Sequence, residues 1–430
     1  MTQTLALLTS APHRVLFLPG TLQLALAMGC WLALLLGAMG SLPTLPETVI
    51  SAPAAHGWLM LYGIFPFFVF GFLFTAVPNW LEVPGPARAD YLAVAIPMAL
   101  GALLFYPGLY LPALAILAVA LHLLGWVAAL GALWRLLLAP PRQPPQQAAG
   151  TPHSIRPTGM IQLVPAASID RRHARVALLA CSMGALGEAA FLTWMLTDVP
   201  FALRLSASLG VWGFLTPLFL AVCHRMIPWF TSRVVQHHAL FRPTGALWVM
   251  AAACLTHAAL ETADLQAWLW VPDAPLAVLA GWLARRWHSA DAYRVRLLAM
   301  LHISFPWAGL AFTLYGIDSL ARLLDTGWDL GHAPQHALGI GFFASMLFAM
   351  ASRVSLGHSG RRLEADRLTW AVFWLVQLAA VLRILPELPP GYFPRHLSAL
   401  SALTWLTASV AWAYRYAPFY WRARIDGKPG

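Results

Sequence analysis

Histidines are the residues of this chain that are best suited to chemistry. The sequence has 430 residues, of which 15 are His, while 60% are hydrophobic and only 10% are charged. Neutral imidazole is the usual protein ligand of haem iron and of copper, whereas magnesium and calcium prefer oxygen ligands. His332 and His336, and likewise His56 and Met60, stand four residues apart and would share one face of a helix. These residue types therefore predict a redox metal site.

Carboxylates and thiols offer little alternative chemistry. Glu188 is the single carboxylate that we expect near the centre of an apolar segment, so a membrane relay built from several acids is disfavoured. No CxxC or CxxCH sequence occurs, which argues against covalently attached haem, a zinc ribbon and a disulfide framework. Each cysteine is best explained as a small buried hydrophobe; the four are Cys30, Cys181, Cys223 and Cys254.

Long apolar runs are the elements that must position these side chains. Soluble domains carry about 25% charged residues, so this composition indicates an integral membrane protein. One crossing of the hydrocarbon core needs about 20 apolar residues. The runs predict an all-α bundle of about twelve transmembrane helices, at residues 15–38, 56–80, 91–106, 109–137, 174–197, 201–230, 243–263, 267–285, 293–317, 333–357, 368–386 and 396–416.

The helices fall into two groups of unequal size. Residues 1–138 hold the first four, and residues 173–417 hold the other eight. Between them, residues 139–172 are rich in Pro and Gln and predict a cytoplasmic linker, and residues 418–430 form a cytoplasmic tail. No internal sequence repeat is evident, which argues against a transporter built from two equivalent halves.

The basic residues report on topology. The net charge is +10, and Lys428 is the only lysine among the 27 basic residues. With both termini in the cytoplasm, nearly all of these residues lie in cytoplasmic connections, as the positive-inside rule requires. Only four would then lie at the outer end, namely Arg204, Arg322, Arg383 and Arg395. We therefore expect both termini to be cytoplasmic, and we expect no nucleic-acid partner.

Four segments resemble the NnrS family of bacterial membrane proteins. The string AHGWLMLYGIFPFFVFGFLFTAVPNW, residues 55–80, is similar to the family's second helix, and HALGIGFFASMLFAMASRVSLGHSGR, residues 336–361, is similar to its tenth. RMIPWFT, residues 225–231, resembles the block that ends the sixth helix, and LHISFPW, residues 301–307, resembles the histidine-bearing ninth helix. The resemblance covers most of the transmembrane chain.

The resemblance implies a twelve-helix protein of the bacterial inner membrane that contains haem and copper and takes part in nitric oxide defence and denitrification. The residues that match family positions are His56, Met60, Arg225, His302, His336, Arg353 and His358. One departure concerns copper: the family's second helix usually reads His-x-His-Glu-Met, and here Trp58 and Leu59 replace the later His and the Glu. A copper site that used that histidine would be lost or rebuilt from His257 or His332.

The first hypothesis is a haem b held between the second and tenth helices, with His56 and His336 as axial ligands. Arg353 and Arg225 are candidates to bind a haem propionate, although both also lie where topology-determining arginines belong. The candidates for a second metal or haem site, toward the inner side, are His302 and His358. For two further histidines, His122 and His257, an interhelical hydrogen bond is the favoured explanation.

The expected chemistry is binding or redox conversion of nitric oxide, dioxygen or a related diatomic molecule at haem iron. Because no flavin-type or CxxCH motif is present, catalysis would need an external electron donor. The first alternative is a secondary transporter or a haem or copper delivery protein. The second is a terminal-oxidase-like or accessory protein of a respiratory complex. The sequence leaves the oligomeric state open.

Overall fold

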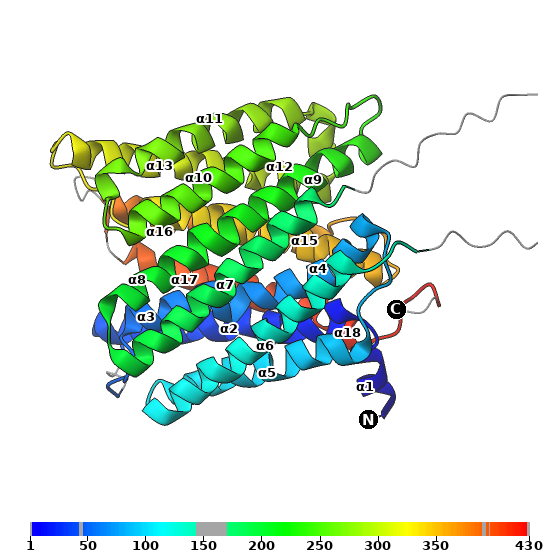
Figure 1. Cartoon of the computed structure of the whole chain (residues 1–430), viewed down its shortest axis with the longest axis horizontal. Helices are drawn as coiled ribbons and strands as arrows, with labels where there is room; N and C mark the ends of the chain where they lie inside the picture. Colours follow the sequence, from blue (N-terminus) through cyan, green and yellow to red (C-terminus); the bar gives the residue numbers. More distant parts are fainter. Residues whose placement is uncertain (1, 43–45, 143–169, 389–392, 395, 428–430) are drawn as a thin grey trace, which may run out of the picture.

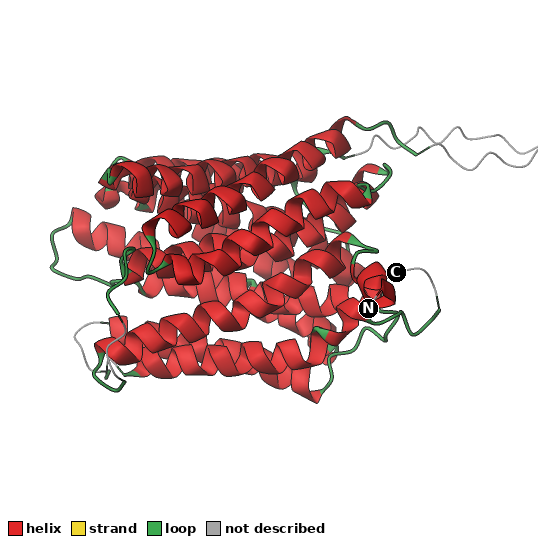
Figure 2. Ribbon diagram, turned by 90° about the horizontal axis from the view of Figure 1, so that it is seen from below, coloured by secondary structure: helices red, strands yellow, loops and turns green. Residues whose placement is uncertain are grey.

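The computed structural model describes residues 2–42, 46–142, 170–388, 393–394 and 396–427, and all regular secondary structure in these ranges is helical. The helices run side by side along the long axis of the molecule (Figures 1 and 2). The first half contains α1 (Thr2–Leu8), α2 (Pro12–Ala38), α3 (Ala52–Trp58), η1 (Leu59–Ile64), α4 (Phe65–Leu81), α5 (Arg88–Gly108), α6 (Pro112–Leu138), α7 (Arg172–Thr197), α8 (Pro200–Ser208), η2 (Leu209–Leu215) and α9 (Thr216–Val234).

The second half contains α10 (Thr244–Thr262), η3 (Gln266–Trp268), α11 (Trp270–Trp287), η4 (Ala290–Arg294), α12 (Arg296–Ser304), α13 (Pro306–Leu323), α14 (Ala333–His336), η5 (Ala337–Ala344), α15 (Ser345–His358), α16 (Arg367–Ile384), η6 (Leu385–Glu387), α17 (Leu397–Tyr416) and α18 (Pro418–Trp421).

These elements join into twelve long segments within the described ranges, close to the twelve predicted spans. Ten of them are long and apolar enough to cross a membrane, and the other two, α10 and α17, are long enough but less apolar. The predicted polytopic helix bundle is therefore confirmed. Of the predicted linker, residues 143–169 lie outside the described ranges.

Three segments form the centre of the bundle, and each contains a π-helical turn. They are α3–η1–α4, α8–η2–α9 and α14–η5–α15, the second, sixth and tenth in chain order. Between 72% and 78% of each is buried, against 61% or less for the other seven apolar spans. Each π turn begins four residues before a glycine, namely Gly63, Gly213 and Gly341. Such turns interrupt the regular helix and occur frequently at functional sites.

The three central segments meet at an aromatic cluster. Phe65 lies 5.8 Å from Phe219 and 6.0 Å from Phe343 between ring centroids, and Phe219 lies 5.1 Å from Phe343. These are ordinary edge and tilted aromatic contacts. The bundle thus has one residue from each central segment near a common axis.

The outer helices repeat one plan three times around this axis. Consecutive helices pack together in α5 with α6, α10 with α11, and α16 with α17. The groups then join through α6 with α7, α11 with α13, and α17 with α2, which closes the ring. The three groups share helix order and the glycine at the π turn, although no repeat is evident in the sequence. The predicted linker therefore separates the first group of four helices from the other two groups, which together contain eight.

Contacts between the central segments follow the same repeat. Arg225 and Arg353 each stand twelve residues after the glycine of their segment, and Trp80 and Phe230 each stand seventeen residues after theirs. The Arg225 guanidinium lies 4.8 Å from the Trp80 ring centroid, and that of Arg353 lies 3.8 Å from the Phe230 centroid. Equivalent cation–π contacts therefore join the first group to the second and the second to the third.

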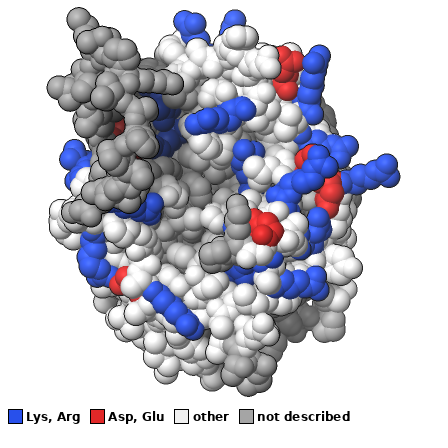
Figure 3. Space-filling model, turned by 90° about the vertical axis from the view of Figure 1, so that its right-hand side faces the viewer, with Lys and Arg blue, Asp and Glu red and all other residues white. Residues whose placement is uncertain are grey.

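Both termini lie at the same end of the bundle (Figure 1). Lys and Arg side chains are frequent on this end, as the view of that face shows (Figure 3). The even number of spans places the connections that the sequence analysis assigned to the cytoplasm together with the termini. We refer to this end as the arginine-rich end.

Close contact between α5 and α6 depends on Gly101. A Cβ atom at this position would lie 2.4 Å from the Ala118 carbonyl oxygen and 2.7 Å from the His122 backbone nitrogen. Gly29 on α2 has no such neighbour within 4 Å. Small residues allow helices to approach closely in membranes, so these two glycines should respond differently to an added methyl group.

We expect Gly101→Ala to destabilise the protein by about 1–3 kcal/mol through overpacking. Thermal unfolding of the purified protein in detergent would measure this as a lower melting temperature. Gly29→Ala should leave the melting temperature unchanged or slightly higher. Equal melting temperatures for the two variants would contradict the packing described here.

Candidate functional site

Two histidines of the central segments lie at the end opposite the termini. His56 is on α3 and His336 on α14, near the start of the second and tenth spans. His336 is within electrostatic range of His56, His332 and Arg383. We call these four residues and Glu387 the His56–His336 cluster. The structure therefore places three histidines that were predicted as haem or metal ligands at one end of the bundle. His56 and His336 are 280 residues apart in the sequence.

The hydrogen bonds of the cluster define which ring nitrogens are free. His336 Nδ1 lies 2.8 Å from the His332 carbonyl oxygen, which can only accept, so Nδ1 carries the proton and Nε2 is left as the metal-binding atom. His56 Nδ1 is buried and has no hydrogen-bond partner among the described residues. The ring of Trp31 stacks on His56 at 4.0 Å between centroids and fixes its plane.

An ion pair on the eleventh span supports the cluster. Arg383 pairs with Glu387, and their side chains are only 18% and 22% exposed. Glu387 also accepts from the His332 backbone nitrogen at 3.4 Å. Arg383 is the guanidinium within electrostatic range of both His56 and His336. Sequence reasoning assigned Arg383 only to the outer end and missed this contact, because the eleventh span carries no motif.

The two predicted propionate-binding arginines lie elsewhere. Arg353 follows His336 by 17 residues on one helical segment, which corresponds to about 25 Å along the axis. Arg225 occupies the equivalent position on the sixth span, and both guanidinium groups stack on aromatic rings as described above. The structure therefore does not bring Arg225 and Arg353 together with the His56–His336 cluster.

The predicted second pair, His302 and His358, is divided between two places at the arginine-rich end. His302 Nε2 lies 3.0 Å from the Thr231 hydroxyl, and His302 lines a cleft that is open to solvent together with His288. His358 instead packs on His13 at 4.3 Å between centroids. No group of three or more His, Cys, Asp or Glu residues suited to a metal ion occurs in the described ranges.

The remaining candidates have different surroundings. Met60 is half-buried on η1 and packs against the core. His257 is fully buried, with Nδ1 2.7 Å from Asp273 Oδ1 and its ring stacked on Trp212 at 3.4 Å. Asp273 lies in the first turn of α11, away from the centre of its span, so Glu188 remains the carboxylate near the centre of a span. The sequence analysis did not single out Asp273, because no local pattern indicates its contact with His257.

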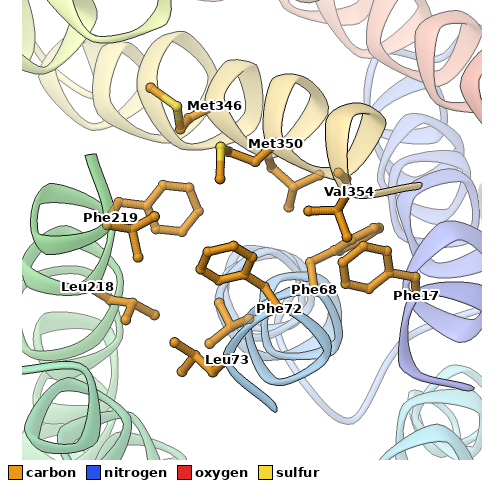
Figure 4. A pocket seen from close by; sticks show the side chains of 13 residues that line it. Phe17, Phe68, Phe72, Leu73, Leu218, Phe219, Met346, Met350 and Val354 are labelled. Atoms are coloured by element: carbon orange, nitrogen blue, oxygen red, sulfur yellow. The ribbon is translucent and has the colours of Figure 1, made fainter. Parts of the chain in front are cut away.

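A wholly apolar cavity lies beside the aromatic cluster, among α2, α4, α9 and α15 (Figure 4). The space not filled by atoms, measured to its open mouth, is about 530 Å³. Its lining side chains include Phe72, Phe219, Met346 and Met350, and they bring aromatic rings and two thioethers to one space. A cavity of this character favours a small uncharged guest over water.

Three central segments with π turns, surrounded by nine further spans in the described ranges, define a polytopic membrane protein. The family comparison agrees with this class. A family model described as NnrS protein matches residues 7–424, nearly the whole sequence, and the chain belongs to the NnrS family. A search of curated proteins finds no match.

The Arg383–Glu387 ion pair provides a direct test of the cluster geometry. In Arg383→Leu, Glu387 keeps its charge in a largely buried place without its partner, and we expect a loss of about 1–3 kcal/mol of stability. Thermal unfolding would show this as a lower melting temperature. The double variant Arg383→Leu/Glu387→Leu should recover part of the loss. A single variant as stable as the unaltered protein would contradict the pairing.

Proposed function

We propose that this protein is a haem b-binding protein of the bacterial inner membrane that acts in nitric oxide metabolism, by binding or redox conversion of a small diatomic molecule. Membership of the NnrS family already makes it a nitric oxide-related membrane protein. The single observation that supports the finer proposal is that His56 and His336 lie at one end of the bundle, within electrostatic range of each other.

The residues of the cluster fit a haem with two imidazole ligands. The Nδ1 proton of His336 is held by a backbone carbonyl, and His56 has a buried nitrogen without a partner. Haem iron bound there would supply electron transfer and a place for a diatomic ligand. Arg383, rather than Arg225 or Arg353, is the guanidinium within electrostatic range of both imidazoles and would bind a haem carboxylate.

The apolar cavity suits the substrate class of this proposal. Nitric oxide and dioxygen are uncharged and enter through lipid, so they need no polar channel. The cavity lies on the same central segments as both candidate ligands, and its lining begins ten residues after His336 and twelve after His56, which is about 15 to 18 Å along the axis. Its residues would exclude water and hold such a molecule, while electrons come from an external donor.

Copper fits the described residues less well than haem. The candidates His302 and His358 belong to separate contacts, and His257 is paired with the Asp273 carboxylate. Met60 and His332 lie near the haem candidates in the sequence, but no three-ligand group forms. We therefore assign no copper ligands, and we expect haem to be bound whether or not copper is present.

The haem assignment predicts that the purified protein has the visible spectrum of haem and that replacing either candidate ligand alters this spectrum. Purified protein should show a Soret band with about one haem per chain, and His56→Ala and His336→Ala should each remove the band or shift it. His257→Ala is the matched control, because it removes a buried imidazole outside the cluster, and it should keep the spectrum. Absence of a Soret band, or unaltered spectra in both cluster variants, would refute the assignment. Metal analysis of the same sample would measure copper.

The arginine distribution also supports a cytoplasmic location for the end that carries both termini. We therefore expect a reporter active only in the cytoplasm to be active when fused after Trp421. The same reporter should be inactive when inserted between α5 and α6, at Tyr110, which is at the other end. The reverse pattern would invert the proposed orientation and place the His56–His336 cluster on the cytoplasmic side.

A further inference from the structure

His122 and Glu188 form a fully buried pair that the proposed haem function does not use. His122 is on α6 and Glu188 on α7, so the pair joins the first group of helices to the second. His122 Nδ1 lies 2.6 Å from Glu188 Oε1, and both side chains are 0% exposed. Glu188 stands nine residues before the end of α7, which places it about 14 Å from that end.

Four buried polar atoms around this pair have no hydrogen-bond partner among the described residues. They are His122 Nε2, Glu188 Oε2, Trp58 Nε1 and Trp126 Nε1. Both indole N–H groups face Glu188 without reaching hydrogen-bonding geometry. The Trp58 ring also meets His122 edge-on, at 5.3 Å between centroids. Unpaired polar atoms are costly in lipid, so such a cluster calls for a functional explanation.

Close packing holds these groups in place. A Cβ atom at Gly184 would lie 2.5 Å from the Trp126 ring, and one at Gly101 would lie 2.7 Å from the His122 backbone nitrogen. Trp58 stacks on Phe105 at 4.0 Å between centroids. The helices therefore cannot rearrange easily around the pair. When its charge changes, the stabilising hydrogen bonds must come from the side chains that already surround it.

We propose that His122 and Glu188, with Trp58 and Trp126, form a proton-binding site inside the membrane. Uptake of one proton from water makes the pair neutral overall: the carboxylic acid donates to Nδ1, and the imidazole proton is on Nε2. Release of that proton to water leaves a carboxylate that accepts from Nδ1–H and faces two indole N–H groups. Only N–H and O–H bonds change, and no electron is transferred.

The unpartnered atoms match the needs of these two states. The indole donors lie where a negative carboxylate needs hydrogen bonds, and a desolvated charge is tolerated only with such donors. The further titratable group that faces Glu188 is Tyr62 on η1, whose hydroxyl donates to the Ser206 carbonyl oxygen at 2.7 Å and so is already committed. No arginine or lysine is recorded beside the pair in the described ranges.

The second buried pair offers a comparison within the same chain. His257 and Asp273 are equally buried and equally close, with Nδ1 2.7 Å from Oδ1. His257 Nε2 and Asp273 Oδ2 are also without a hydrogen-bond partner among the described residues. The difference lies in the indoles: Trp58 and Trp126 face Glu188, whereas Trp212 stacks its ring on His257, with 19° between the planes. We therefore assign the proton-binding role to Glu188 and not to Asp273. The site goes beyond the haem proposal and does not depend on it, although Trp58 is two residues from His56 on α3.

Infrared difference spectroscopy of the full-length protein in lipid nanodiscs tests the site directly. The acid-minus-alkaline spectrum should contain the C=O stretching band of a protonated carboxylic acid, and the band should shift in heavy water. It should disappear in Glu188→Gln and persist in Asp273→Asn. No such band in the unaltered protein, its persistence in Glu188→Gln or its loss in Asp273→Asn would overturn the proposal.

A second variant guards against a folding defect in Glu188→Gln. Trp126→Phe keeps an aromatic ring in the packing and removes one indole N–H. The band should remain in this variant but move in frequency, because the acid or its carboxylate has lost a nearby donor. A band at the original frequency would overturn the role assigned to the indole groups. Neither measurement needs bound haem, so failure here and failure of the haem proposal are distinguishable.

Discussion

The exclusion of water from the bilayer is the constraint on which this structure depends. A buried imidazole or carboxylate cannot be hydrated there, so the bundle must supply its partners from neighbouring helices. His257 and Asp273 show the consequence, because each satisfies one atom of the other. The His56–His336 cluster shows it in another form, with a carbonyl, an aromatic ring and an ion pair arranged around two imidazoles.

Threefold repetition explains why the central spans carry the candidate sites. Each group of four helices contributes one π-containing segment to the centre and surrounds it with three others. A side chain near either end of a central segment therefore meets helices from two groups. His56 and His336 meet at one end, and Arg225 and Arg353 contact the rings of neighbouring groups at the other. One architecture thus places the His56–His336 cluster at one end and the stacked arginines at the other.

Hydrophobic runs were sufficient to predict the helices, because each span needs a long apolar segment and the breaks fall at Pro, Gly and charged residues. His56 and His336 could be chosen from residue type and family resemblance. Arg383 and Asp273 could not, since their importance comes from contacts between spans that no local pattern encodes. The structural repeat is not evident in the sequence, because lipid-facing and core positions tolerate many apolar residues. The shared positions are few: the glycine of each π turn and, in two groups each, an arginine and an aromatic residue after it.

The central claim is that one end of the bundle holds haem between the second and tenth spans. A cryo-electron microscopy map of the purified, haem-containing protein tests it most directly. The account predicts haem density between His56 and His336, with a carboxylate of the haem next to Arg383. Haem density at the arginine-rich end, beside His302 or His358, would contradict it.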